Sequence, residues 1–413
     1  MLNNPFTPSE IASAPEDFFG RAYELRTLER SLVQGSVAIQ GAIGIGKSSL
    51  LSRARLLMEG FNSTNRARSV IAVGDKDIKT IDEAARLLLE SFVHIDQRES
   101  KVKFKLGSLF EIASSEICKY FDEGRHLAIL KRIVEEDYLR RLLSKYDLLI
   151  LAIDEADKCP VPLARLIRSI VTHTQQQGIK QVRFIASGVS PFFQEMVNED
   201  PGINRFIYKT ITLSSMSPDE AADLVETKFY QVVKSAEQNH LKLEFEPDMV
   251  NRIVELSGGH PHIIQLLGSH IVEEEYEDPD GIIDSYDLLK SIRRICYEDR
   301  ARVYDSTLHM LDLHGMLESF MTLLELMHRG FPSRLNRRLA QKHVGKETLQ
   351  WLVDHNILAP QTSGSYGLVD EFLRIRLILD QADTVEDERE FEELIIAGQK
   401  KLQAEDDDDY DDS

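Results

Sequence analysis

The feature that most constrains the fold is a glycine-rich turn between two apolar runs near the amino end. The run 36-SVAIQ-40 reads as a short buried strand, and 49-SLLSRARLLMEG-60 reads as a helix. The residues between them, 41-GAIGIGKS-48, fit the pattern G-x-x-x-x-G-K-[ST]. Glycines let such a turn bring its N–H groups onto phosphate oxygens, and the following helix points its positive end at the same anion. The sequence therefore predicts a phosphate-binding loop in an α/β nucleotide-binding core.

The polar residues of this turn have definite roles in nucleotide chemistry. Lys47 can reach the β- and γ-phosphates of ATP, and the Ser48 hydroxyl can ligate Mg²⁺. We expect the nucleotide to be bound by Gly41, Gly44, Gly46, Lys47, Ser48 and Ser49.

A second apolar run, 148-LLILAI-153, ends in two carboxylates. Its unbroken apolar character is typical of a strand buried on both faces of a parallel sheet, and ligands of such sheets bind at the carboxyl ends of the strands. Asp154 is therefore placed to hold Mg²⁺ through water, and Glu155 to polarise the attacking water. The letters 154-DEAD-157 also occur in RNA helicases, but such a helicase needs a second ATPase lobe, which the chain after residue 217 does not offer.

The composition indicates a folded chain with a strong acidic excess. Its 413 residues suggest two or three domains, since a domain commonly holds about 100–200 residues. The net charge of -20 opposes non-specific binding of the whole molecule to nucleic acid or to an anionic membrane. The acidic end, 404-AEDDDDYDDS-413, reads either as a solvated tail or as a segment that mimics nucleic acid or docks on a basic partner.

The remaining general features favour a cytoplasmic chain with no membrane partner. The cysteines, Cys118, Cys159 and Cys296, have neither zinc-ligand nor redox spacing, which favours a reduced intracellular chain. The amino end lacks the basic and apolar regions of a signal peptide. No apolar stretch approaches the ~18–20 residues that span a bilayer.

Four further segments carry a resemblance to a known group of ATPases. They are 18-FFGRAYELRTLERSL-32, 181-QVRFIASGVSPFF-193, 204-NRFIYKTITLSSMSPDEAADLVETKF-229 and 256-LSGGHPHIIQLLGSHI-271. The third reads as a strand followed by a Ser-Pro-Asp-Glu helix start. Together with the two motifs above, they resemble the AAA+ and STAND P-loop ATPases, and especially the archaeal-type and origin-recognition-like branch. The resemblance covers residues 16–380 and implies an ATPase that uses ATP and Mg²⁺.

The resemblance also implies roles for residues outside the two motifs. Phe19, Gly20 and Arg21 match a segment that cradles adenine. Ser187 matches a first sensor of the γ-phosphate, although asparagine is commoner there, and a plain strand-end turn is the alternative. Arg205 matches an arginine that relatives present to the nucleotide of a neighbouring subunit, and a surface arginine is the alternative.

The segment 258-GGHPH-262 departs from loader-type relatives, which place a second-sensor arginine in this helix. Gly-Gly-x-Pro is similar to the STAND branch, in which the proline packs near the base, so we expect Pro261 and His262 at the nucleotide. His260 and His262 could touch phosphate or could instead close a helical lid. The departure favours a slow nucleotide switch over fast ring-type turnover.

The expected fold class is an α/β P-loop nucleotide-binding core with a parallel sheet, followed by an α-helical lid and a winged-helix domain. The last of these is predicted because three helices precede a short β-ribbon. The expected bounds are 1–215 for the core with a helical insertion at 81–145, 216–312 for the lid, 313–380 for the winged helix and 381–413 for an acidic tail, disordered at its end.

The winged-helix segment holds the one basic concentration of the chain, in residues 329–346, which contain no carboxylate. Its basic residues are Arg329, Arg334, Arg337, Arg338, Lys342 and Lys346. Winged helices often place such residues on DNA phosphates, but STAND-type relatives also use the domain as an internal clamp or a protein-docking surface. Two functions stay open. The first is an oligomeric switch that assembles with ATP and acts on double-stranded DNA. The second is a protein-level regulator, for example in defence or a mobile element, that binds a protein effector.

Overall fold

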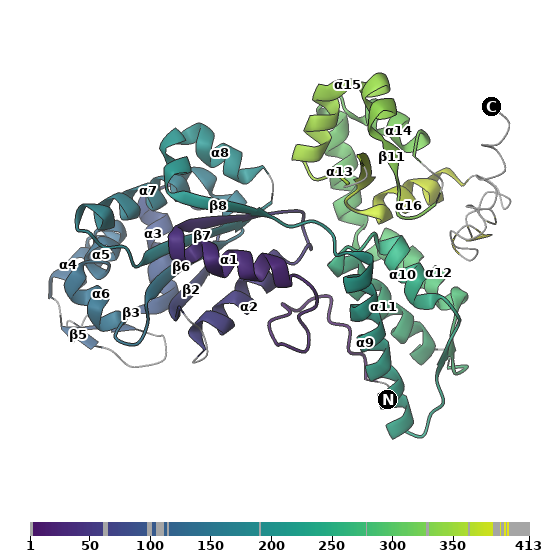
Figure 1. The fold of residues 1–413 in the computed structure, drawn as a ribbon, viewed down its shortest axis with the longest axis horizontal. Coiled ribbons are helices and arrows are strands. Elements are labelled where there is room, and N and C mark those ends of the chain that lie inside the picture. Colours follow the sequence, from purple (N-terminus) through teal and green to yellow (C-terminus); the bar gives the residue numbers. More distant parts are fainter. Residues whose placement is uncertain are drawn as a thin grey trace. The chain divides into compact units, whose positions relative to one another are not determined.

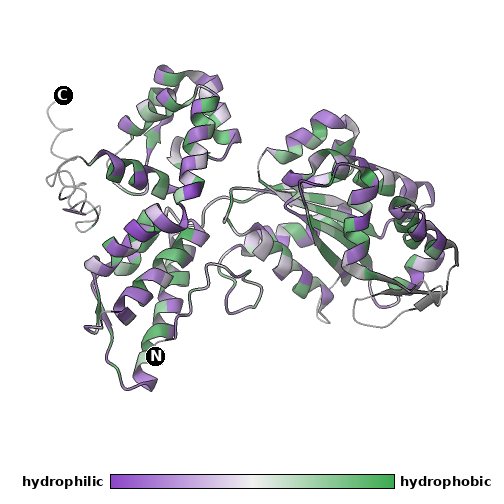
Figure 2. Cartoon of the chain, turned by 180° about the vertical axis from the view of Figure 1, so that it is seen from behind, coloured by the Kyte–Doolittle hydropathy of each residue, from purple (hydrophilic) through white to green (hydrophobic). Residues whose placement is uncertain are grey.

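The structure is a computed structural model that divides into two compact units, Ile11–Leu213 and Met1–Glu10 with Ser214–Ser413 (Figure 1). The described residues are 3–60, 65–96, 101–104, 111–113, 115–189, 191–277, 279–327, 330–361, 364–382, 389, 392, 393 and 395. Hydrophobic residues concentrate along the strands of the first unit (Figure 2). No helix in these ranges is long and apolar enough to cross a membrane.

The unit Ile11–Leu213 is built on a five-stranded sheet in the order β2-β6-β7-β1-β8. The strands are β1 (Ser36–Gln40), β2 (Ala67–Val73), β6 (Leu148–Asp154), β7 (Val182–Gly188) and β8 (Ile207–Thr212). All neighbouring pairs run parallel. Every residue of β6 is buried, as its unbroken apolar run predicts. The predicted α/β core with a parallel sheet is confirmed.

Helices cover both faces of this sheet, so its central strands β1, β6 and β7 are almost wholly buried. The helices around it are α1 (Ala22–Gln34), α2 (Lys47–Glu59), α3 (Ile81–Phe92), α7 (Pro160–Gln176) and α8 (Phe192–Glu199). Leu149, Leu151 and Ile153 of β6 join one core with residues of α3, α7 and α8. On the other face α1 packs against α2, β1 and β8.

The segment 81–145 contains strands as well as helices, so the expectation of a purely helical insertion was wrong. Its other helices are α4 (Ser115–Asp122), α5 (His126–Ile133) and α6 (Glu136–Leu142). Its strands, β3 (Val93–Asp96), β4 (Lys101–Phe104) and β5 (Glu111–Ala113), form an antiparallel sheet in the order β3-β4-β5. The stretches 93-VHID-96 and 101-KVKF-104 alternate apolar and polar residues with the period of a strand. Over four residues that pattern is easily taken for a charged helix face.

The second unit begins with a group of helices. These are α9 (Pro218–Gln238), α10 (Met249–Ser257), α11 (Pro261–Glu277) and α12 (Ser285–Arg294), with the short strands β9 (Glu244–Phe245) and β10 (Ile282–Ile283). The helix start predicted at Ser-Pro-Asp-Glu is present, because Ser217 caps α9 and Glu220 bonds back to the Ser217 N–H at 3.0 Å.

Residues 3–10 pack with these helices and not with the α/β unit, where the sequence predicts them. The reason is Phe6, which is 4% exposed. Its ring lies edge-on to Phe229, with 5.6 Å between the ring centroids. The ring also occupies the space that a side chain at Gly268 of α11 would fill.

The carboxyl-terminal part continues with a π-helical turn, η3 (Ile295–Asp299), and four helices. These are α13 (Ala301–Leu313), α14 (Leu317–Glu325), α15 (Arg337–Asp354) and α16 (Glu371–Gln381). The strands β11 (Leu335–Asn336), β12 (Leu358–Pro360) and β13 (Ser365–Leu368) pair antiparallel in the order β11-β13-β12. Gly345, with φ of 81°, is a break in the helical backbone inside α15.

Two features of the sequence reading fall outside the described residues. They are Arg329 and the acidic end 404–413.

Candidate nucleotide-binding site

The glycine-rich turn lies between β1 and α2, where the sequence predicts it. Gly44 and Gly46 have φ values of 78° and 97°, a left-handed conformation that side chains rarely adopt. Gly41 is required for another reason, because a Cβ there would lie 2.8 Å from the backbone oxygen of Leu213. The three glycines that we expected at the phosphates are therefore each required by the shape of the turn.

The helix α2 starts from this turn without a side-chain cap, since Gly46 occupies the capping position. The N–H groups of the first helical turn have no partner inside a helix, so such an end attracts an anion. The Ser49 hydroxyl is engaged elsewhere, because its Oγ accepts a hydrogen bond from the Ala12 N–H at 3.2 Å. Ser49 thus anchors the segment that precedes α1.

Lys47 folds back across the turn. Its Nζ donates to the carbonyl oxygens of Gly41 at 3.0 Å and of Ala42 at 2.6 Å. Burial lowers the Lys47 pKa, while nearby carboxylates, Asp154 first among them, raise it. The ammonium group is thus largely removed from water and held by neutral carbonyl oxygens, which a phosphate oxygen would replace as a stronger partner.

The two motifs meet at one hydrogen bond. The Ser48 hydroxyl donates to Oδ2 of Asp154 at 2.5 Å, although 106 positions separate the two residues. Asp154 is only 7% exposed, and its Oδ1 accepts from the Glu155 N–H at 3.0 Å. A hydroxyl and a carboxylate in contact at the carboxyl edge of a parallel sheet are the kind of oxygen ligands that Mg²⁺ prefers.

Glu155 follows directly in a left-handed conformation with φ of 52°. Gly74, the residue that follows β2, supports this backbone, since it donates its N–H to the Asp154 carbonyl oxygen at 2.7 Å. The Glu155 side chain is exposed and forms an ion pair with Lys158. A left-handed residue other than glycine is costly and is found disproportionately at functional sites. The sequence reading did not identify Lys158, although its spacing of three residues from Glu155 was visible.

Ser187 lies in β7, beside the strand that leads into the turn, where it pairs with Ile39. It is fully buried, and its Oγ has no hydrogen-bond partner among the described residues. An unpartnered buried hydroxyl costs about 1–3 kcal/mol, which is a reason to expect a ligand there. Asp157, which the sequence reading did not assign, accepts from the Val189 N–H at 2.9 Å and so ties the Glu155 segment to the end of β7.

The segment expected to cradle adenine contacts the turn directly. Arg21 is 5% exposed, and its Nη2 donates to the Ile45 carbonyl oxygen at 3.2 Å. Both Gly20 and Arg21 have left-handed backbones, with φ of 62° and 59°. Phe19, immediately before them, is partly exposed. The structure brings these residues to the turn, while their contact with adenine stays a prediction.

Residues 9–387 match the family model described as Novel STAND NTPase 1. The chain belongs to this family. Among solved structures it is similar to the Walker-type ATPase PABY2304 of Pyrococcus abyssi, with 14% identity, a TM-score of 0.57, and coverage of 89% of this chain and 98% of that one. It is also similar to the Aeropyrum pernix ORC2 protein in ADPNP-ADP complexes, with 13% identity, a TM-score of 0.52, and coverage of 92% and 98%. No curated protein matches. The expected AAA+/STAND resemblance is confirmed.

One predicted residue of this STAND NTPase, Arg205, lies away from the turn within the same unit. Arg205 ends the short helix η2 (Pro201–Arg205), just before β8. Since β8 runs parallel to β1 from Ile207 to Thr212, Arg205 lies at the edge where the strands begin, and the turn lies where they end. About five residues at ~3.3 Å each separate those edges, so Arg205 does not face the turn of its own chain.

The residues predicted from 258-GGHPH-262 belong to the second unit. Pro261 begins α11, and His262 follows it. Burial lowers the His262 pKa, as does Arg300, whereas a hydrogen bond with the Pro8 backbone raises it. Their contact with a nucleotide stays a prediction.

Proposed function

We propose that this STAND NTPase is a Mg²⁺-dependent ATPase whose nucleotide state controls its assembly or its recruitment of a partner. The observation that carries the proposal is the Ser48–Asp154 hydrogen bond, which joins the phosphate-binding turn to the acidic end of β6. The nucleotide complexes of the Aeropyrum pernix ORC2 protein, which has a similar fold, support ATP as the ligand.

Each residue around the turn has a separate role in hydrolysis. Lys47 exchanges its carbonyl partners for the β- and γ-phosphate oxygens, and the buried Ser187 hydroxyl donates to the γ-phosphate. Ser48 and Asp154 hold the metal ion. Mg²⁺, when bound, neutralises charge on the phosphates. Glu155 orients the attacking water and polarises it, and its carboxylate is held within reach of the site by Lys158.

The test compares ATP binding with ATP hydrolysis in three variants. Lys47→Ala should lose binding of a fluorescent ATP analogue. Glu155→Gln should keep binding and lose hydrolysis by about a hundredfold or more, the typical contribution of a general base. Glu195→Gln, which makes the same change at an exposed glutamate of α8, is the matched control and should retain the wild-type activity. Hydrolysis by Glu155→Gln at the wild-type rate would contradict the proposal.

Arg205 acts, in this proposal, on the nucleotide of a neighbouring copy. Its place at the edge of the sheet opposite the turn supports action between subunits. Such an arginine neutralises charge that develops during phosphoryl transfer. Glu155→Gln with ATP should therefore form a larger particle than the same chain with ADP, measured by light scattering. An equal mass in both nucleotides would argue against ATP-dependent assembly.

The basic face of α15 supports double-stranded DNA as the partner. Arg334, Arg337, Arg338, Lys342 and Lys346 are all exposed. None of these side chains forms an ion pair within the part of the chain that the structure describes, so they can meet phosphates without losing protein partners. Arg338 and Lys342 lie four residues apart within α15, which places them on one face of that helix, while Arg334 precedes β11. We interpret the helices and strands of residues 313–380 as a winged helix that presents this face.

Salt dependence distinguishes DNA from a protein effector. The logarithm of DNA affinity falls with the logarithm of salt concentration, and each lost phosphate contact makes that fall less steep by about 0.9. Arg337→Glu with Arg338→Glu should therefore reduce the magnitude of the slope by about 2. Lys234→Glu with Arg302→Glu is the matched control, since it makes the same charge change at exposed residues outside α15. If both double variants lost the same amount of DNA affinity, a protein effector would be favoured as the partner of the basic face.

A further inference from the structure

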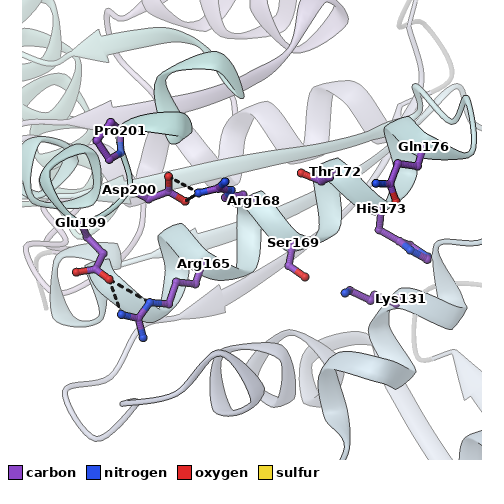
Figure 3. A pocket seen from close by; sticks show the side chains of 10 residues that line it. All are labelled: Lys131, Arg165, Arg168, Ser169, Thr172, His173, Gln176, Glu199, Asp200 and Pro201. Carbon is purple, nitrogen blue, oxygen red and sulfur yellow. Dashed lines mark hydrogen bonds and ion pairs between the residues drawn. The ribbon is translucent and has the colours of Figure 1, made fainter.

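A polar groove of about 610 Å³ lies along the outer face of α7 in the ATPase unit (Figure 3). One wall is the chain between α8 and η2, and the other includes Lys131 of α5. Two ion pairs join α7 to the first wall, Arg165 with Glu199 and Arg168 with Asp200 (Figure 3). The second pair lies directly before the turn that ends in Arg205.

Asp200 is the better buried member of its pair. Its side chain is 10% exposed, against 54% for Arg168. Nη1 of Arg168 donates to both carboxylate oxygens, at 2.7 and 2.8 Å. This contact holds the Asp200 pKa below its ordinary range, and the more distant charge of Arg205 acts in the same direction. Asp200 is therefore ionised and fixed against α7 at neutral pH.

The same carboxylate shapes the turn that follows. Oδ1 of Asp200 accepts from the Gly202 N–H at 3.0 Å and so caps η2. The Asp200 carbonyl oxygen accepts from the N–H of Ile203 at 2.9 Å, and Ile203 is fully buried. Only five residues make up this short helix, and its last one is the exposed Arg205. The orientation of Arg205 thus depends on where Asp200 is held.

The helix that holds Asp200 starts at the hydrolytic site. α7 begins at Pro160, soon after Asp154 and Glu155, and its 17 residues extend about 25 Å toward the other edge of the sheet. We infer that Arg168 and Asp200 are positioning residues for Arg205, which set the turn that presents this arginine to the nucleotide of a neighbouring copy. The inference rests on the proposed action of Arg205 between subunits.

The test mixes two chains that are each inactive alone. The donor, Glu155→Gln, binds ATP and offers Arg205 but does not hydrolyse. The acceptor, Arg205→Ala, can hydrolyse but offers no arginine. Their mixture should recover ATPase activity. Arg168→Ala added to the donor should then lower the activity of the mixture at least tenfold, whereas the same change in the acceptor should leave it unchanged, because no Arg205 remains there to position.

Three further variants separate positioning from a loss of folding. Arg165→Ala in the donor breaks the exposed pair on the same helix and should leave the activity unchanged. Arg168→Lys in the donor should restore part of the activity, since one nitrogen makes both contacts with Asp200. Asp200→Asn in the donor should lower it, as Arg168→Ala does.

The outcomes are distinct. An inactive parental mixture would overturn the action of Arg205 between subunits, and with it this inference. An active mixture that Arg168→Ala leaves unchanged, or lowers equally from donor and acceptor, would overturn the inference alone.

Discussion

Glu371→Gln should make the second unit more stable at alkaline pH. Glu371 begins α16 and is 1% exposed. Its Oε1 accepts from the N–H and the hydroxyl of Ser333, at 2.8 and 2.7 Å. Its Oε2 has no partner within the described ranges. Burial raises the Glu371 pKa to about 7, outweighing the bonds from Ser333 and the charge of Arg374, which lower it.

The size and sign of the effect follow from this pKa. Its difference from the ordinary value of 4.5, at about 1.36 kcal/mol per unit, corresponds to about 3 kcal/mol. The folded chain holds the proton more tightly than the unfolded chain. This stabilisation is therefore complete below pH 4.5 and is lost as the pH rises through 7. Glutamine stays neutral, so the variant should match the wild type near pH 4.5 and exceed its free energy of unfolding by about 3 kcal/mol at pH 8.

The assay is urea unfolding between pH 5 and 8, followed by the fluorescence of Trp351. This is the single tryptophan of the chain, and it lies in α15 of the same unit. Glu347→Gln, at an exposed position on that helix, is the control and should give no pH-dependent difference. The reasoning would be refuted if Glu371→Gln differed from the wild type by the same amount at pH 5 and at pH 8.

Three further predictions concern single contacts. Ser48→Ala removes the hydrogen bond to Asp154 and the proposed metal-ligand hydroxyl. The Mg²⁺ concentration that half-saturates ATP hydrolysis should therefore rise at least tenfold. Ser48→Thr keeps a hydroxyl, so its half-saturating Mg²⁺ concentration should stay near that of the wild type. Gly74→Ala would place a Cβ 2.4 Å from the Glu155 carbonyl oxygen; thermal unfolding should show a loss of about 1–3 kcal/mol, and ATP hydrolysis should fall. Phe6→Ala should cost the second unit about 3–5 kcal/mol in urea unfolding, and an unchanged midpoint would count against its packing role.

The conformation of the glycine-rich turn could be predicted because its parts are local in the sequence. A strand, a glycine turn and a helix specify the backbone around Lys47 without reference to the rest of the chain. The meeting of Ser48 and Asp154 also follows, since parallel strands bring their carboxyl ends to one edge. The ion pair of Glu155 with Lys158 was within reach of the same reasoning, because both residues lie in one short segment.

Other parts depend on contacts that no local pattern encodes. The strands β3 to β5 are three or four residues long, too short for their alternation to outweigh the surrounding charges. The place of residues 3–10 rests on the ring of Phe6 against Gly268 and on long-range hydrogen bonds, such as that of the Asn4 side chain with Ser269, 265 positions away. The pairing of Arg168 with Asp200 joins a helix to a turn 32 positions away.

The two glycines of 258-GGHPH-262 are also required by neighbours that are distant in the sequence. A Cβ at Gly259 would lie 2.4 Å from the Met216 carbonyl oxygen, and the Gly259 carbonyl oxygen accepts from the Met216 N–H at 2.9 Å. A Cβ at Gly258 would lie 3.1 Å from Cγ of Glu371. A side chain at position 259 would thus meet the chain that follows β8, and one at position 258 would meet α16. Because both glycines also have left-handed backbones, with φ of 57° and 72°, a residue with a side chain would be strained at either position.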